Sequence, residues 1–178
     1  YGNMPAGSYM YIGPHGIVHG TTITVLNALR KIGKAPGEGA LFVTAGLGGM
    51  SGAQPKAANI SGCVSVTAEV NPAASRKRHE QGWVDEITDD ISELVARVRK
   101  AQEGQETVSI AYEGNVVDVW EVFDKEGIHI DLGSDQTSLH NPWAGGYYPV
   151  DISFEDANTM MAEQPDLFKE KIQETLRR

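Results

Sequence analysis

Apolar positions along the chain alternate between short continuous runs and segments with helical spacing. Four runs have the length and composition of strands buried in a parallel sheet: 40–45, 63–68, 108–112 and 128–132. Helical spacing predicts helices in six other segments: one beginning at Thr21 or Thr22, then 53–60, 72–102, 116–125, 153–163 and 166–178.

The longest helical segment, 72–102, carries most of its large apolar residues in its second part. There they recur at spacings of three and four, which predicts one continuous buried face: Val84, Ile87, Ile91, Leu94, Val95 and Val98. The first part carries a basic cluster, Arg76-Lys77-Arg78. We interpret this cluster as solvated on the surface of the helix.

The order strand, helix, strand, helix, strand, helix, strand predicts an α/β fold, a Rossmann-like parallel sheet with helices on both faces. We expect a single domain over residues 1–178, divided into a helical lead-in (1–38), a dinucleotide-binding core (39–150) and C-terminal helices (151–178). The chain opens at Tyr1 and ends within a predicted helix, so we expect a segment of a longer enzyme. Trimming of a small natural protein is the alternative.

Charge and composition exclude several classes of function. The 178 residues include 15 Lys+Arg and 24 Asp+Glu, a net charge of −9, which counts against nucleic-acid binding. The single cysteine, Cys63, excludes an internal disulfide framework and agrees with a cytoplasmic setting. The five histidines lack metal-ligand spacing, so we predict no metal site. No run approaches the ~20 apolar residues of a membrane span, so we expect no membrane association.

The glycine-rich stretch after the first predicted strand has the spacing of a dinucleotide fingerprint. Gly46 and Gly48 give a tight turn and let a pyrophosphate approach the backbone, and Ser51 stands where a third small residue is required. Glu69 ends the next strand, where a carboxylate accepts hydrogen bonds from an adenosine ribose and repels a 2′-phosphate. The pattern predicts NAD rather than NADP; for Glu69 an ordinary solvated strand end is the alternative.

Other polar residues follow the later strands, where open α/β sheets bind ligands. Gly114-Asn115 follows the third strand, and Asn115 is either a cofactor contact or a plain turn residue. The stretch 133–142 is rich in donors and acceptors, and we expect it to line the ligand. Neither a Ser-His-Asp triad at 134–140 nor a catalytic thiol at Cys63 is predicted, because the geometry and the expected burial are wrong for them.

These segments together resemble the urocanase family, the urocanate hydratases. Two motifs carry the resemblance, Thr44-Ala45-Gly46-Leu47-Gly48-Gly49-Met50-Ser51-Gly52-Ala53-Gln54-Pro55 and Asp135-Gln136-Thr137-Ser138-Leu139-His140. Further matching segments occur in the family's order: Tyr1-Gly2-Asn3-Met4, Gly7–Gly13, Gly16–Gly20, Trp83-Val84-Asp85-Glu86 and Gly114-Asn115.

The resemblance implies the central NAD-binding domain of a longer lyase that works in histidine degradation. Such an enzyme adds water to urocanate to give imidazolone propionate, with tightly bound NAD+ as an electrophile and no net hydride transfer. It also implies a homodimer of the full-length protein. The catalytic residues, including an active-site cysteine, are expected outside this segment.

The resemblance also implies which residues contact NAD. With the fingerprint glycines, they are Asn3, Gly46, Gly48, Gly49, Met50, Ser51, Glu69, Asn115, Val116, Gln136, Thr137, Ser138, Leu139, His140, Tyr147 and Tyr148. Asn3, Ser51 and Ala74 depart from the family pattern, which leaves the contacts there open. Two alternatives remain at this point, an NAD-dependent oxidoreductase domain and a nucleotide-binding module without catalysis.

Overall fold

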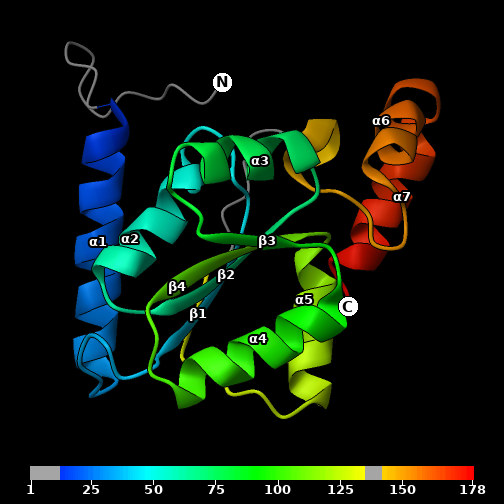
Figure 1. Cartoon of the computed structure of the whole chain (residues 1–178). Helices are drawn as coiled ribbons and strands as arrows, with labels where there is room; N and C mark the ends of the chain where they lie inside the picture. Colours follow the sequence, from blue (N-terminus) through cyan, green and yellow to red (C-terminus); the bar gives the residue numbers. More distant parts are fainter. Residues whose placement is uncertain (1–12, 135–141) are drawn as a thin grey trace.

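A parallel five-stranded sheet forms the centre of the computed structural model, which describes residues 13–134 and 142–178 (Figure 1). The strands lie in the order β3-β4-β2-β1-β5 and every neighbouring pair is parallel. Their bounds are β1 (Leu41–Ala45), β2 (Val64–Glu69), β3 (Glu86–Thr88), β4 (Val108–Glu113) and β5 (Leu132–Gly133). The predicted α/β class with a parallel sheet is confirmed.

Helices cover both faces of the sheet, as predicted (Figure 1). One face packs against α4 (Ile91–Glu103) and α5 (Val116–Lys125), whose Leu94, Val98 and Phe123 are fully buried. The other face packs against α1 (Gly13–Lys31), α2 (Gln54–Ile60) and α3 (Pro72–Glu80). The remaining elements are η1 (Ser51–Ala53), η2 (Pro142–Gly146), α6 (Phe154–Glu163) and α7 (Pro165–Thr175).

The first helix is longer than predicted. It begins at Gly13 rather than at Thr21 or Thr22, and the hydroxyl of Thr22 donates to the carbonyl of Val18 inside the helix instead of capping it. Val25 and Leu29 anchor the helix in the core. Once those turns are packed, extending the helix through Gly16 and Gly20 costs only about 0.5–1 kcal/mol per glycine relative to alanine.

The single long helix predicted at 72–102 is wrong. The chain forms α3, then the edge strand β3, and then α4, which is capped by the Asp90 carboxylate. Val84 and Ile87 have helical spacing by coincidence, since Val84 precedes β3 and packs against Leu47 and Ala111, and Ile87 lies on β3. Tertiary pairing of β3 with β4 therefore overrides the local periodicity.

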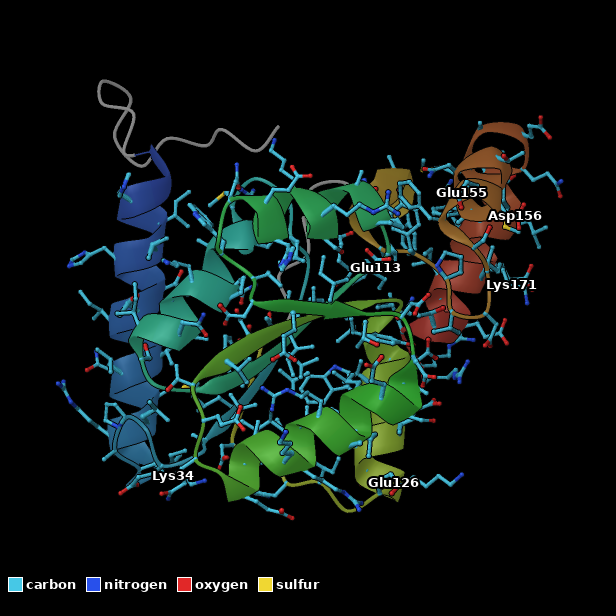
Figure 2. All side chains as sticks on the ribbon, viewed as in Figure 1. Lys34, Glu113, Glu126, Glu155, Asp156 and Lys171 are labelled. Atoms are coloured by element: carbon cyan, nitrogen blue, oxygen red, sulfur yellow. The ribbon has the colours of Figure 1, made fainter. Side chains whose placement is uncertain are left out.

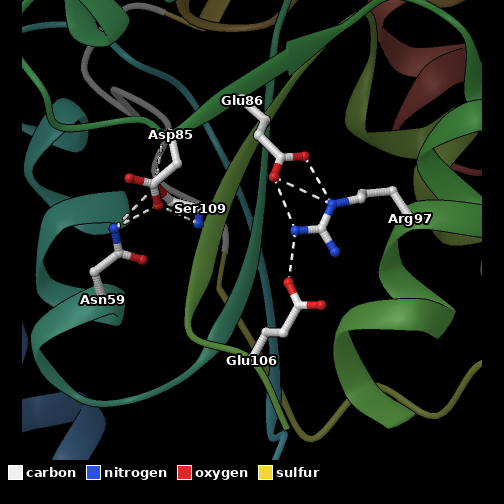
Figure 3. Close-up of polar contacts among 6 residues, drawn as sticks. All are labelled: Asn59, Asp85, Glu86, Arg97, Glu106 and Ser109. Carbon is white, nitrogen blue, oxygen red and sulfur yellow. Dashed lines mark hydrogen bonds and ion pairs between the residues drawn. The ribbon is translucent and has the colours of Figure 1, made fainter. Parts of the chain in front are cut away.

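Polar side chains hold the N-terminal end of the short strand β3 (Figure 3). The Asp85 carboxylate accepts hydrogen bonds from the side chain of Asn59 and from the backbone and hydroxyl of Ser109, each at 2.8 Å. Burial alone would raise the pKa of Asp85, but these hydrogen bonds lower it overall. Arg97 donates to both carboxylate oxygens of Glu86 and to Glu106.

The fourth predicted strand, 128–132, is also wrong in extent, because only Leu132 and Gly133 pair with β1. The Asp131 side chain explains the difference. Its carboxylate accepts the amide hydrogen of Leu41 at 2.9 Å and lies 2.7 Å from the ammonium of Lys34, which Figure 2 labels at the end of the molecule opposite Glu113. A side chain therefore replaces a ladder hydrogen bond at the start of β1.

Candidate functional site

The strand order reverses beside β1, so β2 and β5 lie on its two sides and the loops that follow β1 and β5 diverge at one edge of the sheet. In open α/β sheets such a switch point is where ligands bind. The glycine-rich loop 46–52 follows β1 there. The predicted site residues of this loop and Glu69 therefore share one edge.

The glycine-rich loop turns sharply at its start and is open at its tip. Gly46 has φ +89°, a conformation that L side chains rarely adopt, and its amide donates to the carbonyl of Ala68. Gly48, Gly49 and Met50 are exposed. In the described part of the chain, the backbone amides of residues 48–51 have no protein acceptor. Four donors are thus available to a ligand with anionic oxygens.

Leu47, which sequence reasoning did not single out, anchors the loop. Its side chain is 1% exposed and packs with Val84 and Ala111. Its amide donates to the Glu69 carboxylate at 2.6 Å, and its carbonyl accepts from Nε of Arg78 at 3.0 Å. The backbone of Leu47 is therefore held by a negative side chain at its amide and by a positive side chain at its carbonyl.

The interpretation of the basic cluster on α3 as solvated is wrong for one of its members. Arg76 and Lys77 are exposed, but Arg78 turns inward and donates to the carbonyls of Leu47 and Gly48. Burial lowers the pKa of Arg78 from its usual high value. A Cβ on Gly52 would lie 2.6 Å from Cζ of Arg78, so Gly52 leaves the space that this side chain fills.

Two carboxylates end neighbouring strands at this edge. Glu69 and Glu113 are partners in the register of β2 and β4, and Figure 2 labels Glu113 there. Besides Leu47, the Glu69 carboxylate accepts the amide hydrogen of Asn71 at 2.9 Å. An ionised carboxylate has about four acceptor positions, so these two bonds leave Glu69 able to accept from ligand hydroxyls.

Asn115 joins the edge of the sheet to the segment that follows η2. Its side-chain oxygen caps α5 by accepting from Val117, and its amide group donates to the carbonyl of Tyr148 at 2.9 Å. The hydroxyl of Tyr148 donates to Asn158 on α6. Burial is the main cause that raises the pKa of Tyr148, and the nearby charge of Glu69 adds to it. The Tyr148 side chain itself contacts α6, through its hydroxyl and through the packing of its ring on Phe154.

The remaining predicted contacts divide into three groups. Val116 begins α5 and packs against the core beside the site, and Tyr147 packs with Trp143 against the α6–α7 pair. Ser51 begins η1 directly after the open amides. Asn3 and the stretch from Gln136 to His140 lie outside the described residues.

A buried cluster of polar side chains connects the segments that meet at the switch point. The hydroxyls of Thr44 and Ser134 lie 2.8 Å apart, and both contact the side-chain oxygen of Gln54, at 2.8 and 3.0 Å. Gln54 is 3% exposed. These three residues connect the end of β1, the start of α2 and the residue that follows β5, so the loops that follow β1 and β5 share one anchor.

Sequence reasoning missed Arg78, Gln54 and Glu113. Glu113 carried a usable signal, because it precedes a glycine at the end of a buried strand as an acidic side chain does at β2. Gln54 and Arg78 carried none, since their roles depend on which way a helical side chain points.

Other reactive groups lie away from this edge. Burial, aided by the charge of Asp131, raises the pKa of the Cys63 thiol to about 11. Within residues 13–134 and 142–178, no cluster of His, Cys, Asp and Glu is arranged to bind a metal ion. The described helices include none that is both long and apolar enough to cross a bilayer.

The fold and this edge define a Rossmann-like α/β domain with a glycine-rich loop at the carboxyl edge of its sheet. A family model described as the urocanase Rossmann-like domain matches residues 13–178. The chain belongs to the urocanase family, which confirms the resemblance seen in the sequence.

Curated relatives agree with this assignment. The chain is 59% identical to a probable urocanate hydratase of Dictyostelium discoideum over 180 residues and 56% identical to the urocanate hydratase of Mus musculus over 184 residues. It is 39% identical to a probable urocanate hydratase of Halobacterium salinarum over 183 residues. Each alignment covers 100% of this chain and only 27%, 27% and 30% of the respective relative. The chain thus spans little more than a quarter of their length.

Proposed function

We propose that this chain is the NAD+-binding domain of a urocanate hydratase, a hydro-lyase that adds water to urocanate in histidine degradation. The observation that carries the proposal is the loop 48–51, whose four amides have no acceptor among the described residues and which follows Leu47, the residue bonded to Glu69, at the carboxyl edge of the sheet. The family membership of the chain supports the same reaction.

The residues present fit a dinucleotide. Pyrophosphate oxygens need several convergent donors, and free backbone amides supply them without a net positive charge. A Cβ on Gly49 would meet nothing within 4 Å, and one on Gly48 would meet only the Ser51 hydroxyl at 3.8 Å, so the loop tip leaves open space for a ligand. Glu69 retains acceptor positions for ribose hydroxyls.

The chain's own residues bind and orient in this proposal. The amides of residues 48–51 bind the pyrophosphate, and Glu69 accepts hydrogen bonds from the adenosine ribose. Met50, a member of the same loop whose side chain is 49% exposed, offers an apolar surface. When bound, oxidised NAD supplies an electron sink for hydration of the imidazole substrate. Proton transfer and exclusion of water require groups from the rest of the longer protein.

Mass spectrometry of the ligand released when the purified protein is denatured tests the cofactor. We expect NAD+, or, for protein purified empty, calorimetric binding of NAD+ in preference to NADP+. Release of a flavin or NADP+, or no binding of either nicotinamide dinucleotide, would contradict the proposal.

Catalysis is tested by the loss of urocanate's ultraviolet absorbance. We predict turnover by a full-length protein that carries this chain and none by residues 1–178 alone in the presence of NAD+, because the described residues form no complete catalytic set. Turnover by the shorter chain would show that the catalytic residues lie inside it, with His140 and Tyr148 the first to examine.

The cytoplasmic setting and the homodimer complete the proposal. Both rest on likeness to the family. Cell fractionation and light scattering on the full-length protein test them, and a monomer or a membrane-bound form would contradict them.

A further inference from the structure

The guanidinium of Arg78 lies behind the glycine-rich loop and contacts two consecutive peptide groups. Its Nε donates to the carbonyl of Leu47 at 3.0 Å, and its Nη2 donates to the carbonyl of Gly48. The carbonyl of Gly48 also accepts from the amide of Gly52, which closes the loop onto η1. One planar side chain thus determines the orientation of two peptide planes.

The orientation of these planes decides where the loop amides point. In a trans peptide, the carbonyl of one residue and the N–H of the next point in opposite directions. Because the carbonyls of Leu47 and Gly48 point toward Arg78, the amides of Gly48 and Gly49 point away from it, toward the exposed side of the loop. These are two of the four amides that have no protein acceptor in the described part of the chain.

The charge of Arg78 is a second, independent observation. Its Nη1 donates to the side-chain oxygen of Gln81 at 2.8 Å, and its Cζ lies 5.1 Å from the centre of the Trp83 ring. All these partners are neutral, and among the described residues no carboxylate forms an ion pair with it. A half-buried cation with no ion-pair partner among the described residues, directly behind amides that have no acceptor there, favours an anion on the other side of the loop.

We propose that Arg78 is a positioning residue that orients the amides of the glycine-rich loop toward an anionic ligand and adds positive charge behind them. The identity of this ligand, the pyrophosphate of a dinucleotide, rests on the proposed function. The role of Arg78 in ordering the loop does not rest on the proposed function. Arginine is required because its Nε and Nη2 donate in parallel to adjacent oxygens, whereas the ammonium of lysine is a single point.

Amide hydrogen exchange in the ligand-free protein tests the loop. The amides of Leu47 and Gly52 are bonded to Glu69 and Gly48, so they report whether the loop keeps its shape. We expect Arg78→Met to accelerate their exchange at least about tenfold and Arg78→Lys to have an intermediate effect. Lys77→Met, which removes an exposed charge from the same helix, is the matched control and leaves exchange unchanged.

Calorimetry with NAD+ and with inorganic pyrophosphate tests the ligand. Loss of the Arg78 hydrogen bonds and charge predicts about tenfold to hundredfold weaker binding of both probes in Arg78→Met, with partial recovery in Arg78→Lys. Lys77→Met binds as the unmodified protein does. Gly52→Ala displaces the guanidinium but keeps its charge, so it provides a second test if Arg78→Met does not fold.

The outcomes separate this inference from the proposed function. Unchanged exchange together with unchanged affinity in Arg78→Met would overturn the inference, and so would faster exchange with unchanged affinity, because Arg78 would then serve the fold alone. If the unmodified protein binds no NAD+, the proposed function fails, and the exchange and pyrophosphate measurements still decide the role of Arg78.

Discussion

Replacing Glu69 by alanine is the sharpest test of cofactor choice, because this carboxylate has two separable roles. Within the protein it accepts the amides of Leu47 and Asn71, which orders the loop. Toward a ligand, its remaining acceptor positions face the proposed adenosine ribose. Loss of loop order weakens NAD+ and NADP+ alike, whereas loss of the ribose contact weakens NAD+ alone.

The expected magnitude follows from the type of bond. A hydrogen bond to a charged group contributes about 1.5–3 kcal/mol, and about 1.4 kcal/mol corresponds to a factor of ten in affinity. Glu69→Ala should therefore weaken NAD+ roughly tenfold to hundredfold. NADP+ should lose less, since removing the carboxylate also removes its repulsion of the 2′-phosphate.

Isothermal titration with NAD+, NADP+ and 2′-deoxy-NAD+ measures these contributions. The unmodified protein should prefer NAD+ over both analogues, and Glu69→Ala should narrow both preferences. Glu80→Gln, an exposed carboxylate on α3, is the control and should leave all three affinities unchanged. Equal weakening of all three ligands by Glu69→Ala would refute the ribose contact and leave Glu69 with the loop alone.

Three further predictions concern other residues. Gly48→Val should keep the thermal midpoint close to that of the unmodified protein, because among the described residues a Cβ there meets only the Ser51 hydroxyl, at 3.8 Å. It should weaken the binding of NAD+ at least about hundredfold, because the branched side chain fills the space of the pyrophosphate. A calorimetric affinity equal to that of the unmodified protein would contradict this. Asp85→Asn should destabilise the protein by about 0.5–1.5 kcal/mol at neutral pH in urea unfolding, a modest loss because solvent screens this exposed carboxylate, with Asp89→Asn, an exposed carboxylate outside this hydrogen-bond cluster, as the control. Because the pKa of Asp85 is lowered in the folded protein, its contribution to stability is present above its unfolded-state pKa near 4 and is lost as the pH falls through the folded-state pKa. The difference in unfolding free energy between Asp85→Asn and the unmodified protein should therefore narrow below about pH 4. A difference that stays constant with pH would contradict the role given to the Asp85 hydrogen bonds. Cys63, with its thiol pKa raised to about 11, should resist iodoacetamide in the native protein at about pH 8 and react only after unfolding, as mass spectrometry would show.

The strands that the sequence predicted well are those buried on both faces. Residues 41–45, 64–69 and 108–113 are buried along all but their last position, and the polar residues at their buried positions are the small Ser and Thr. The edge strand β3 has only three residues, all half-buried, so its composition resembles that of a loop or a helix. The sequence also contained no sign that the side chain of Asp131 would replace part of the ladder at β5.

The meeting of the candidate site residues at one edge of the sheet was predictable, but the contacts that hold the glycine-rich loop there were not. Parallel strands end at the same edge, so Gly46–Ser51 and Glu69 had to meet there. Arg78 reaches the loop from the far end of α3, and its contacts are with backbone carbonyls, which every residue possesses. No residue pattern records such a contact.

The side chains around β3 also bear on association between copies of the chain. A free strand edge is a template for pairing with another strand, and proteins protect such edges with short strands and charged groups. Here the outermost strand has three residues and carries Glu86, which is paired with Arg97. The short length and the charge of this edge strand both disfavour pairing with a strand of another copy.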